Sequence, residues 1–391
     1  MRILFVNYEY PPLGGGGGVA TRDIAVELAK RHEVDVLTSA APDLSPFEES
    51  EGVRIHRVPV IGRTRRSTAS ILSMISFWPV GIRYGRRLLD GRSYDVVNSW
   101  FAVPSGPTGL HLARSLHAPH VVTMAGGDIY DPSKWYTPDK NPILKVAVRR
   151  VLAASHGHIA VSTDLARRAR EIYGFEGPID VISLGAAAPR FPPATRAELG
   201  LEPGVIYLTT VGRLVRRKNL CSLLTALSRI AREDVQLLIV GDGPEQPVLQ
   251  AQAQQLGIAH RVQFRGFVPE ETKYQLLAAS DAFVLPSLHE AFGLVYLEAM
   301  HCGLPVVAGR PGGQEDYLTD GRTGFLVPHT DIEALVAVLQ RLVDDPELRA
   351  TMSRHNRAVA QRFSVAATAD EYETLFSRIG RTEPAPACAA A

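Results

Sequence analysis

Two carboxylates in the stretch HEAFGLVYLEAM stand eight positions apart around an expected helix start. Glu290 lies before the helix, where a carboxylate can accept hydrogen bonds from sugar hydroxyls, and Glu298 lies in its first turns, within reach of a ribose diol. Between them, Phe292, Gly293 and Leu294 place backbone amides at the positive end of the helix, which suits a phosphate. The pattern therefore indicates a sugar-phosphate site, although a lone pair of this kind is more often a solvated helix face.

Two cations follow another expected strand, in the stretch VGRLVRRKNL. Arg213 and Lys218 come after the strand-end residue Gly212, at the turn into a helix. Two fixed positive charges at such a turn can hold a diphosphate and stabilise it as a leaving group. Ordinary surface cations are the alternative, and the carboxylates nearby in the same half of the chain favour the phosphate site.

Five consecutive glycines in PPLGGGGGVA follow a first expected strand at residues 2–7. A flexible linker is disfavoured, because a helix is expected directly afterwards, at residues 19–31. Gly15, Gly17 and Ala20 match the dinucleotide-binding fingerprint, but the second strand ends in Leu-Thr-Ser instead of the acid that would hold a ribose. The favoured interpretation is a loop whose bare backbone approaches a phosphate or a sugar at a helix start.

Both halves of the chain alternate short apolar runs with amphipathic helical patterns. This alternation predicts parallel strands connected by helices, and so an α/β fold. The expected strands are 2–7, 33–38, 53–58, 95–100, 120–124, 157–162 and 179–183 in the first half, and 205–212, 235–241, 261–266, 281–287, 305–309 and 323–328 in the second.

A proline-rich stretch separates the two halves and predicts a linker over residues 186–203. We therefore expect a Rossmann-like domain over 1–185, a second one over 204–362, a helix at 363–380 that packs back on the first domain, and a disordered tail over 381–391. Open parallel sheets bind ligands beyond the carboxyl ends of their strands, so two such sheets facing each other predict a cleft between the domains.

The composition of the 391-residue chain is that of a globular protein, with 46% hydrophobic and 21% charged residues. The formal net charge of +1 argues against a nucleic-acid partner. The three cysteines are unclustered, so we expect reduced thiols in place of disulfides or a metal site. No apolar run reaches the ~18 residues of a membrane span and no signal segment is evident, so we expect a cytoplasmic protein, with the inner membrane surface as a further location.

Taken together, these motifs resemble the retaining glycosyltransferases of family 4, which have the two-domain GT-B fold. The matching stretches are, in order, PPLGGGGG, VGRLVRRKN, VGDGPE, HEAFGLVYLEAM and PGGQEDYLTDGRTGFLV, so the resemblance spans nearly the whole chain. Its specific element is the E-x7-E pair with the upstream Arg and Lys. The resemblance implies two Rossmann-like domains whose parallel sheets face an interdomain cleft.

The resemblance also implies a role for each motif. Arg213 and Lys218 would bind the donor phosphates and, with Glu290 on the donor sugar hydroxyls, form the catalytic group. The donor-binding positions would be Gly15, Gly16, Gly212, Val268, Phe292, Gly293, Leu294 and Glu298, with backbone near Val268 on the base and Glu298 on the ribose. The acceptor or sugar loop would consist of Gly17, Gly126, Gly127 and Asp128.

The implied reaction moves a sugar from a nucleotide-diphospho-sugar, of the UDP or GDP type, to an acceptor hydroxyl with retention of configuration. The nucleotide sugar is a co-substrate, and neither a metal ion nor another cofactor is expected, because there is no D-x-D triplet and Arg and Lys supply the positive charge. The leaving phosphate would take the proton of the incoming hydroxyl. Two alternatives stay open: a nucleotide-sugar epimerase of the same fold, and a nucleotide-sugar binder without catalysis.

The chain departs from the family pattern at three places. The stretch VVTMAGGDIYD carries Ala125 where the family commonly has a histidine, although Gly126, Gly127 and Asp128 are intact. Asp316 stands where a glutamate is usual, and VISLGAAAPRF lacks the Asn and Asp of the family's interdomain loop. These departures weaken any transfer of the family's substrate preferences.

Residues 61–92 contain seven arginines against one acid, with Phe77 and Trp78 in the middle. A basic amphipathic segment of this kind can lie on a membrane surface and serve a lipid-linked acceptor. The more ordinary alternative is a helix of the N-terminal domain with arginines on its wet face and aromatic rings in the core. The acceptor stays open among a sugar, a lipid-linked sugar and a small molecule.

Overall fold

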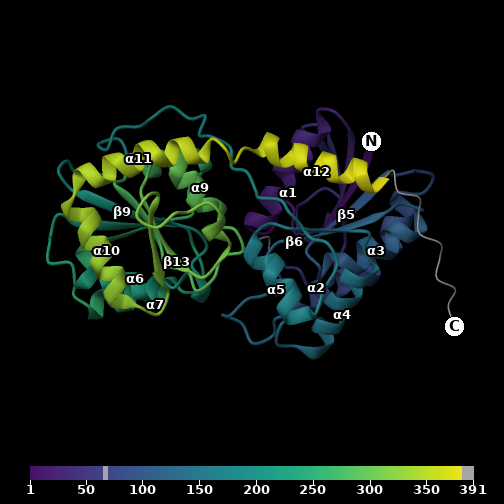
Figure 1. Ribbon diagram of the computed structural model, residues 1–391, viewed down its shortest axis with the longest axis horizontal. Coiled ribbons are helices and arrows are strands. Elements are labelled where there is room, and N and C mark those ends of the chain that lie inside the picture. The colour runs from purple at the N-terminus through teal and green to yellow at the C-terminus, as the bar shows by residue number, and fades with distance from the viewer. Residues whose placement is uncertain (65–68, 381–391) are drawn as a thin grey trace. The chain divides into compact units, whose positions relative to one another are not determined.

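The computed structural model describes residues 1–64 and 69–380, and the chain forms two compact units (Figure 1). The first unit contains Met1–Gly185 together with the segment that begins at Val365, and the second contains Ala186–Ser364. The tail 381–391, which we expect to be disordered, lies outside the described residues.

The first unit is built on an eight-stranded sheet in the order β3-β4-β2-β1-β5-β6-β7-β8. All its pairs are parallel except that of β3 with β4. The central strands are almost wholly buried, as expected for a sheet covered by helices on both faces. The strands are β1 Arg2–Asn7, β2 Glu33–Ser39, β3 Phe47–Ser50, β4 Val53–Val58, β5 Val96–Trp100, β6 His120–Met124, β7 Gly157–Ala160 and β8 Asp180–Val181.

Strand β3 is the one strand of this sheet that the sequence pattern does not predict. Its residues are FEES, which lack the apolar alternation of a half-buried strand, and three of its four side chains are exposed. It is an edge strand in a hairpin with β4, joined by Glu51 and Gly52, both of which have positive φ. The turn therefore specifies this strand, because two residues with positive φ form the tight connection that hairpins favour.

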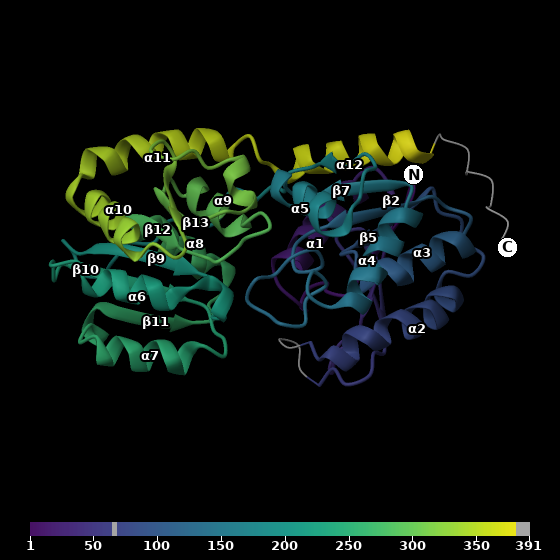
Figure 2. The same ribbon diagram turned by 60° about the horizontal axis from the view of Figure 1, so that its bottom comes forward.

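The helices of the first unit cover both faces of its sheet. Their bounds are α1 Gly16–Ala29, α2 Ile71–Leu88, α3 Ser105–Ser115, α4 Pro142–Ala154, α5 Thr163–Tyr173 and α12 Val365–Gly380. Helices α1 and α12 lie side by side, with the Arg31 guanidinium 2.6 Å from Asp370 and 2.8 Å from Glu373. Figure 2 shows α2, α3 and α4 on the other side of the sheet. Helix α1 begins at Gly16 instead of residue 19, so three of the five glycines form its first turn.

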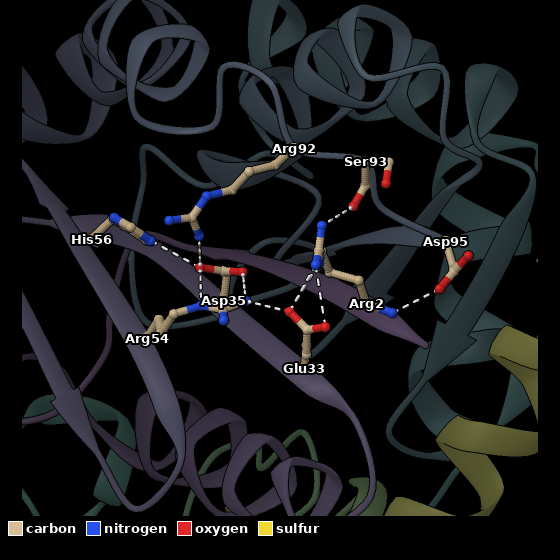
Figure 3. Close-up of polar contacts among 8 residues, drawn as sticks. All are labelled: Arg2, Glu33, Asp35, Arg54, His56, Arg92, Ser93 and Asp95. Atoms are coloured by element: carbon tan, nitrogen blue, oxygen red, sulfur yellow. Dashed lines mark hydrogen bonds and ion pairs between the residues drawn. The ribbon is translucent and has the colours of Figure 1, made fainter.

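A charged network crosses the amino-terminal part of this sheet (Figure 3). Asp35 of β2 is fully buried and accepts hydrogen bonds from Arg54, His56 and Arg92, at 2.7–3.0 Å. Burial raises the pKa of Asp35, but the bonds from His56 and Arg54 outweigh it and hold that pKa well below its usual range. Asp35 thus has a structural role near the start of β2, and the carboxyl end of this strand, Leu37-Thr38-Ser39, presents no carboxylate for a ribose, which weakens the dinucleotide interpretation of the glycine run.

The second unit is built on a six-stranded parallel sheet in the order β11-β10-β9-β12-β13-β14. The strands are β9 Ile206–Val211, β10 Val235–Val240, β11 Val262–Gly266, β12 Ala282–Leu285, β13 Val306–Arg310 and β14 Gly324–Pro328. The helices are α6 Leu220–Ser228, α7 Gln246–Gln255, α8 Glu270–Ala279, α9 Leu294–His301, α10 Ile332–Asp344 and α11 Pro346–Ala360. Each unit is thus a Rossmann-like α/β layer structure, as the alternation of strands and helices predicts.

The segment 186–203, whose prolines predict a linker, belongs to the second unit. Arg196 ties it down: its guanidinium donates to the carbonyl oxygens of Val205 and Ala279 and lies 2.8 Å from Asp281. A proline-rich composition shows that a stretch lacks regular structure, but it does not show whether side chains fasten that stretch to a domain.

Candidate functional site

The strand order of the second unit marks a ligand position at one edge of its sheet. Strand β9 continues through α6 to β10, its neighbour on one side, whereas the adjacent β12 continues through α9 to β13 on the other side. Ligands of open α/β sheets bind at such a switch point, beyond the carboxyl ends of the strands. The loops that leave β9 and β12 there carry Arg213, Lys218 and Glu290.

A buried ion pair connects these two loops. The Lys218 Nζ lies 2.7 Å from Oε1 of Glu290, and the Ser287 hydroxyl donates to the same oxygen at 2.7 Å. Burial raises the pKa of Glu290, but the charges of Lys218 and Arg217 outweigh it and lower that pKa to about 2. Glu290 is therefore ionised at neutral pH, and its carboxylate is oriented before a ligand arrives.

Backbone bonds and one asparagine hold the two loops together. The Leu288 amide donates to the carbonyl oxygen of Arg217 at 2.8 Å. Asn219 has the left-handed φ of 54° and ends the short turn Arg216–Lys218, and its side-chain amide donates to the carbonyl oxygens of Pro286 and His329. Asn219 thus fixes the turn that presents Lys218. Asparagine tolerates this conformation better than other residues with a side chain, and this preference at a helix start is the signal that could have identified it.

The start of α9 presents the amides that the sequence predicts. Gly293 has φ +86°, and a Cβ there would lie 2.5 Å from the Tyr296 ring, so only glycine fits. The Tyr317 hydroxyl lies 2.8 Å from the carbonyl oxygens of both Phe292 and Gly293, shares its one proton between them, and so holds the turn. The side chain of Phe292 is buried, with its ring 5.0 Å from that of Tyr317. Only its backbone can therefore face a ligand, together with the amides of Gly293 and Leu294.

The remaining predicted positions of this unit lie on neighbouring loops. Glu298 of α9 forms an ion pair with Lys273 of α8, at 3.0 Å, a partner that the spacing of the two glutamates does not reveal. Val268 follows β11 and is half-buried. Arg213 is exposed, whereas Arg217, which the sequence pattern does not single out, is the second cation that acts on Glu290.

Three glycines of the N-terminal run are required by their packing. Gly14 has φ +89°, and a Cβ there would lie 2.5 Å from the Glu9 side chain. A Cβ at Gly17 would lie 2.6 Å from the Phe101 ring, and one at Gly18 would lie 3.0 Å from the Glu9 carbonyl oxygen. Phe101 itself has φ +76°, a strained conformation for a bulky residue.

The other two glycines face open space. A Cβ at Gly15 or Gly16 would have no neighbouring atom within 4 Å. Gly15 precedes α1, its amide donates to Glu9 at 3.3 Å, and no side chain caps the helix. The run follows β1, which lies beside β5 at the switch point of the first sheet, because β1 continues to β2 on one side and β5 to β6 on the other. Bare backbone therefore stands where a ligand of this unit is expected.

The loop after β6 is shaped by the buried carboxylate of Asp128. Its oxygens accept hydrogen bonds from the amides of Ala102 and Gly126, both at 2.8 Å, and of Ala125 at 3.2 Å. Burial raises the pKa of this carboxyl to about 6, against the opposing effect of these amides. Asp128 thus organises the turn at Gly126 and Gly127, and the contacts of its carboxylate are with backbone.

Two family models match the chain and together cover both units. The model described as "Glycosyl transferase 4-like domain" matches residues 15–185, and that described as "Glycosyl transferases group 1" matches residues 193–359. The D-inositol 3-phosphate glycosyltransferase of Rhodococcus erythropolis is 31% identical over 388 residues, which cover 91% of this chain and 85% of that protein.

Solved structures show the same fold. Sucrose-phosphate synthase from Thermosynechococcus elongatus superposes with a TM-score of 0.86 at 24% identity, over 97% of this chain and 99% of that one. Anabaena HepE in complex with UDP and glucose superposes with a TM-score of 0.76 at 22% identity, over 97% of this chain and 100% of that one. Because both the family models and the relative extend across the two units, this chain belongs to the family 4 glycosyltransferases, enzymes with the GT-B fold.

Proposed function

We propose that this enzyme transfers a sugar, with retention of configuration and without a metal ion, from a nucleotide-diphospho-sugar to an acceptor hydroxyl. The observation that carries the proposal is the buried pair of Lys218 and Glu290 at the switch point of the second sheet. UDP is the first candidate for the nucleotide, because the HepE structure of the same fold was obtained with UDP and glucose, and GDP is the alternative.

In this proposal Lys218 binds the diphosphate of the donor, and Glu290 binds its sugar. A lysine ammonium has three N–H donors, and the bond to Glu290 occupies one of them, so the others can meet the diphosphate. As the bond between the sugar and the diphosphate breaks, negative charge grows on the phosphate oxygens. Lys218, Arg213 and the amides at the start of α9 would stabilise that charge. The ionised Glu290 would accept hydrogen bonds from the sugar hydroxyls, and the leaving phosphate would take the acceptor proton.

The remaining predicted positions complete the donor and acceptor sites. We assign Glu298 to the ribose and backbone near Val268 to the base, and the exposed backbone at Gly15 and Gly16 to the diphosphate and acceptor. A lipid-linked acceptor would require the enzyme to reach a membrane surface, for which residues 61–92 are the candidate. A soluble sugar or a small molecule would not.

Ligand stabilisation and product analysis together test the proposal. We expect one nucleoside diphosphate among UDP, GDP, ADP and TDP to raise the melting temperature by several degrees, since a ligand at about a hundred times its Kd adds ~2.7 kcal/mol. NAD serves as the control nucleotide, and stabilisation by NAD alone would contradict the proposal. With the matching nucleotide sugar, an epimerase would convert the donor without an acceptor, and a silent binder would release no nucleotide with any acceptor. A transferase releases one nucleoside diphosphate for each glycoside that it forms. NMR of that glycoside determines whether the anomeric configuration of the donor is retained.

Single alanine substitutions can show which glycines of the run are needed for packing and which leave space for a ligand. Gly16→Ala should leave the free energy of unfolding unchanged or raise it by up to ~1 kcal/mol, because alanine favours the first turn of α1 and its Cβ meets nothing. Its kcat/KM should nevertheless fall about tenfold, since the methyl group would occupy the space assigned to the ligand. Gly17→Ala should instead destabilise the protein by roughly 1–3 kcal/mol through its clash with Phe101. Full activity in Gly16→Ala would contradict this assignment.

A further inference from the structure

Helix α2 carries an exposed apolar stripe. Ile71, Leu72, Ile75 and Trp78 are 50%, 55%, 62% and 53% exposed. Ile71, Ile75 and Trp78 follow the spacing i, i+4 and i+7, which places them on one face of the helix. Four large apolar side chains next to one another on a helix are more than the scattered exposed residues of an ordinary surface.

The opposite face of α2 is firmly seated on the first unit. Ser73, Phe77, Gly81 and Gly85 are buried, and a Cβ at Gly81 would lie 2.8 Å from the Thr108 side chain of α3. The two neighbouring aromatic rings therefore have different environments: Phe77 lies in the core, whereas Trp78 is exposed. The helix cannot turn to bury the stripe without losing this packing, so the stripe is a fixed surface.

The charged side chains of α2 itself are all arginines, and the first acid after the helix is Asp90. No Asp or Glu occurs from Val53 to Leu89. Arg83, Arg86 and Arg87 are exposed at the carboxyl end of α2. Two other arginines of residues 61–92 have partners within the first unit. Arg63 is buried near the Tyr8 ring, and Arg92 pairs with Asp35.

We propose that α2 docks the first unit on an anionic lipid bilayer, with the stripe among the acyl chains and the three arginines at the headgroup phosphates. Basic helices with an apolar face lie in the plane of a membrane in this way, and tryptophan favours the boundary between lipid and water. No helix in residues 1–64 or 69–380 is both long and apolar enough to cross a membrane. A second copy of the chain is a poorer occupant, because α2 offers no acid to neutralise the arginines of a facing α2.

The docked helix would bring the bilayer to the glycine run. The hydroxyl of Ser73, in the first turn of α2, is 2.6 Å from that of Tyr8, the residue after β1. The run leaves the same strand end, so the stripe and the exposed backbone at Gly15 and Gly16 belong to one edge of the first unit. Docking does not depend on the transfer reaction, and its test does not use activity.

Vesicle co-sedimentation of the full-length protein tests the inference. We expect binding to vesicles of phosphatidylcholine with 30% phosphatidylglycerol, and binding at least tenfold weaker to pure phosphatidylcholine. The variant Ile75→Ser/Trp78→Ser should lose at least tenfold in affinity for the anionic vesicles. Arg86→Gln/Arg87→Gln should lose affinity by a similar factor at low salt and by less at high salt, because ionic strength screens the interaction.

Matched variants in the second unit serve as controls. Val248→Ser removes an apolar side chain that is 53% exposed, and Arg354→Gln removes an exposed arginine, so both should bind vesicles as the wild type does. Equal binding of Ile75→Ser/Trp78→Ser and the wild type would overturn the inference, and so would the absence of binding to anionic vesicles. A wild-type dimer in light scattering that Ile75→Ser/Trp78→Ser converts to a monomer, without vesicle binding, would assign the stripe to a second copy instead.

Discussion

We expect the replacement of Lys218 by alanine to lower kcat/KM for glycosyl transfer by about 10²–10³-fold, with most of the loss in kcat. This is the usual consequence of removing one fixed donor from a site where negative charge develops in the transition state. Lys218 is suited to that role because the bond to Glu290 and the turn ended by Asn219 hold its ammonium in place before the donor binds. Steady-state kinetics with saturating acceptor separate kcat from KM.

Two controls keep the Lys218→Ala result interpretable. Lys30→Ala removes a lysine that pairs with Glu27 on the surface, and it should retain wild-type kinetics. Lys218→Ala also leaves Glu290 buried without its ion-pair partner, which costs stability, so its thermal unfolding must begin above the assay temperature. A folded Lys218→Ala enzyme with kcat/KM within threefold of the wild type would remove Lys218 from the leaving-group site.

The sequence predicts the fold because parallel α/β units carry their own pattern. Buried strands are short apolar runs, and the helices between them have one apolar face, so strands and helices alternate visibly along the chain. The elements that escape this pattern have other determinants. Strand β3 is a polar edge strand specified by its turn, and the segment 186–203 is held by the long side chain of Arg196.

The sequence identifies candidate site residues in the loops that follow strands, as it does for Lys218 after β9 and Glu290 after β12. It does not predict the partners that orient them. Tyr317 and Lys273 contact the start of α9 and Glu298 from distant positions that only folding brings close, and Asn219 bonds to the carbonyl oxygens of Pro286 and His329, which are also distant in the sequence. The glycine run shows the same limit, since periodicity cannot tell that Gly17 is required by Phe101 while Gly16 faces open space.

The same limit explains the two interpretations of residues 61–92. Phe77 and Trp78 are adjacent in the sequence, so composition assigns both rings to one environment. The phase of α2 against α3 decides which ring is buried, and this phase depends on close packing at Gly81 and Gly85. Glycines inside a helix are unfavourable by propensity, and here they let two helices approach each other.

Replacing Glu290 by glutamine has two effects that differ in their dependence on pH. The first effect is on activity: the carboxylate assigned to the sugar hydroxyls is lost, so kcat/KM should fall at least tenfold. The second is on stability, because the buried ammonium of Lys218 then faces a neutral amide instead of a negative charge. The pKa of Glu290 is about 2 in the folded protein against an ordinary value near 4.5, and this difference corresponds to roughly 3 kcal/mol of stability.

The sign of that shift determines where the stability is lost. A carboxyl whose pKa is lowered by folding stabilises the protein at every pH above its ordinary value, and the contribution disappears as the pH falls from about 4.5 towards 2. Glu290→Gln should therefore be less stable than the wild type by roughly 3 kcal/mol at pH 7, with the difference closing at acidic pH. Chemical denaturation of both proteins at several pH values measures it, and Glu27→Gln, which loses only a surface pair, should differ by less than about 1 kcal/mol throughout. A difference that stayed constant with pH would mean that the charge of Glu290 is not what holds the two loops together, and that Asn219 and the backbone bond from Leu288 to Arg217 suffice to position Lys218.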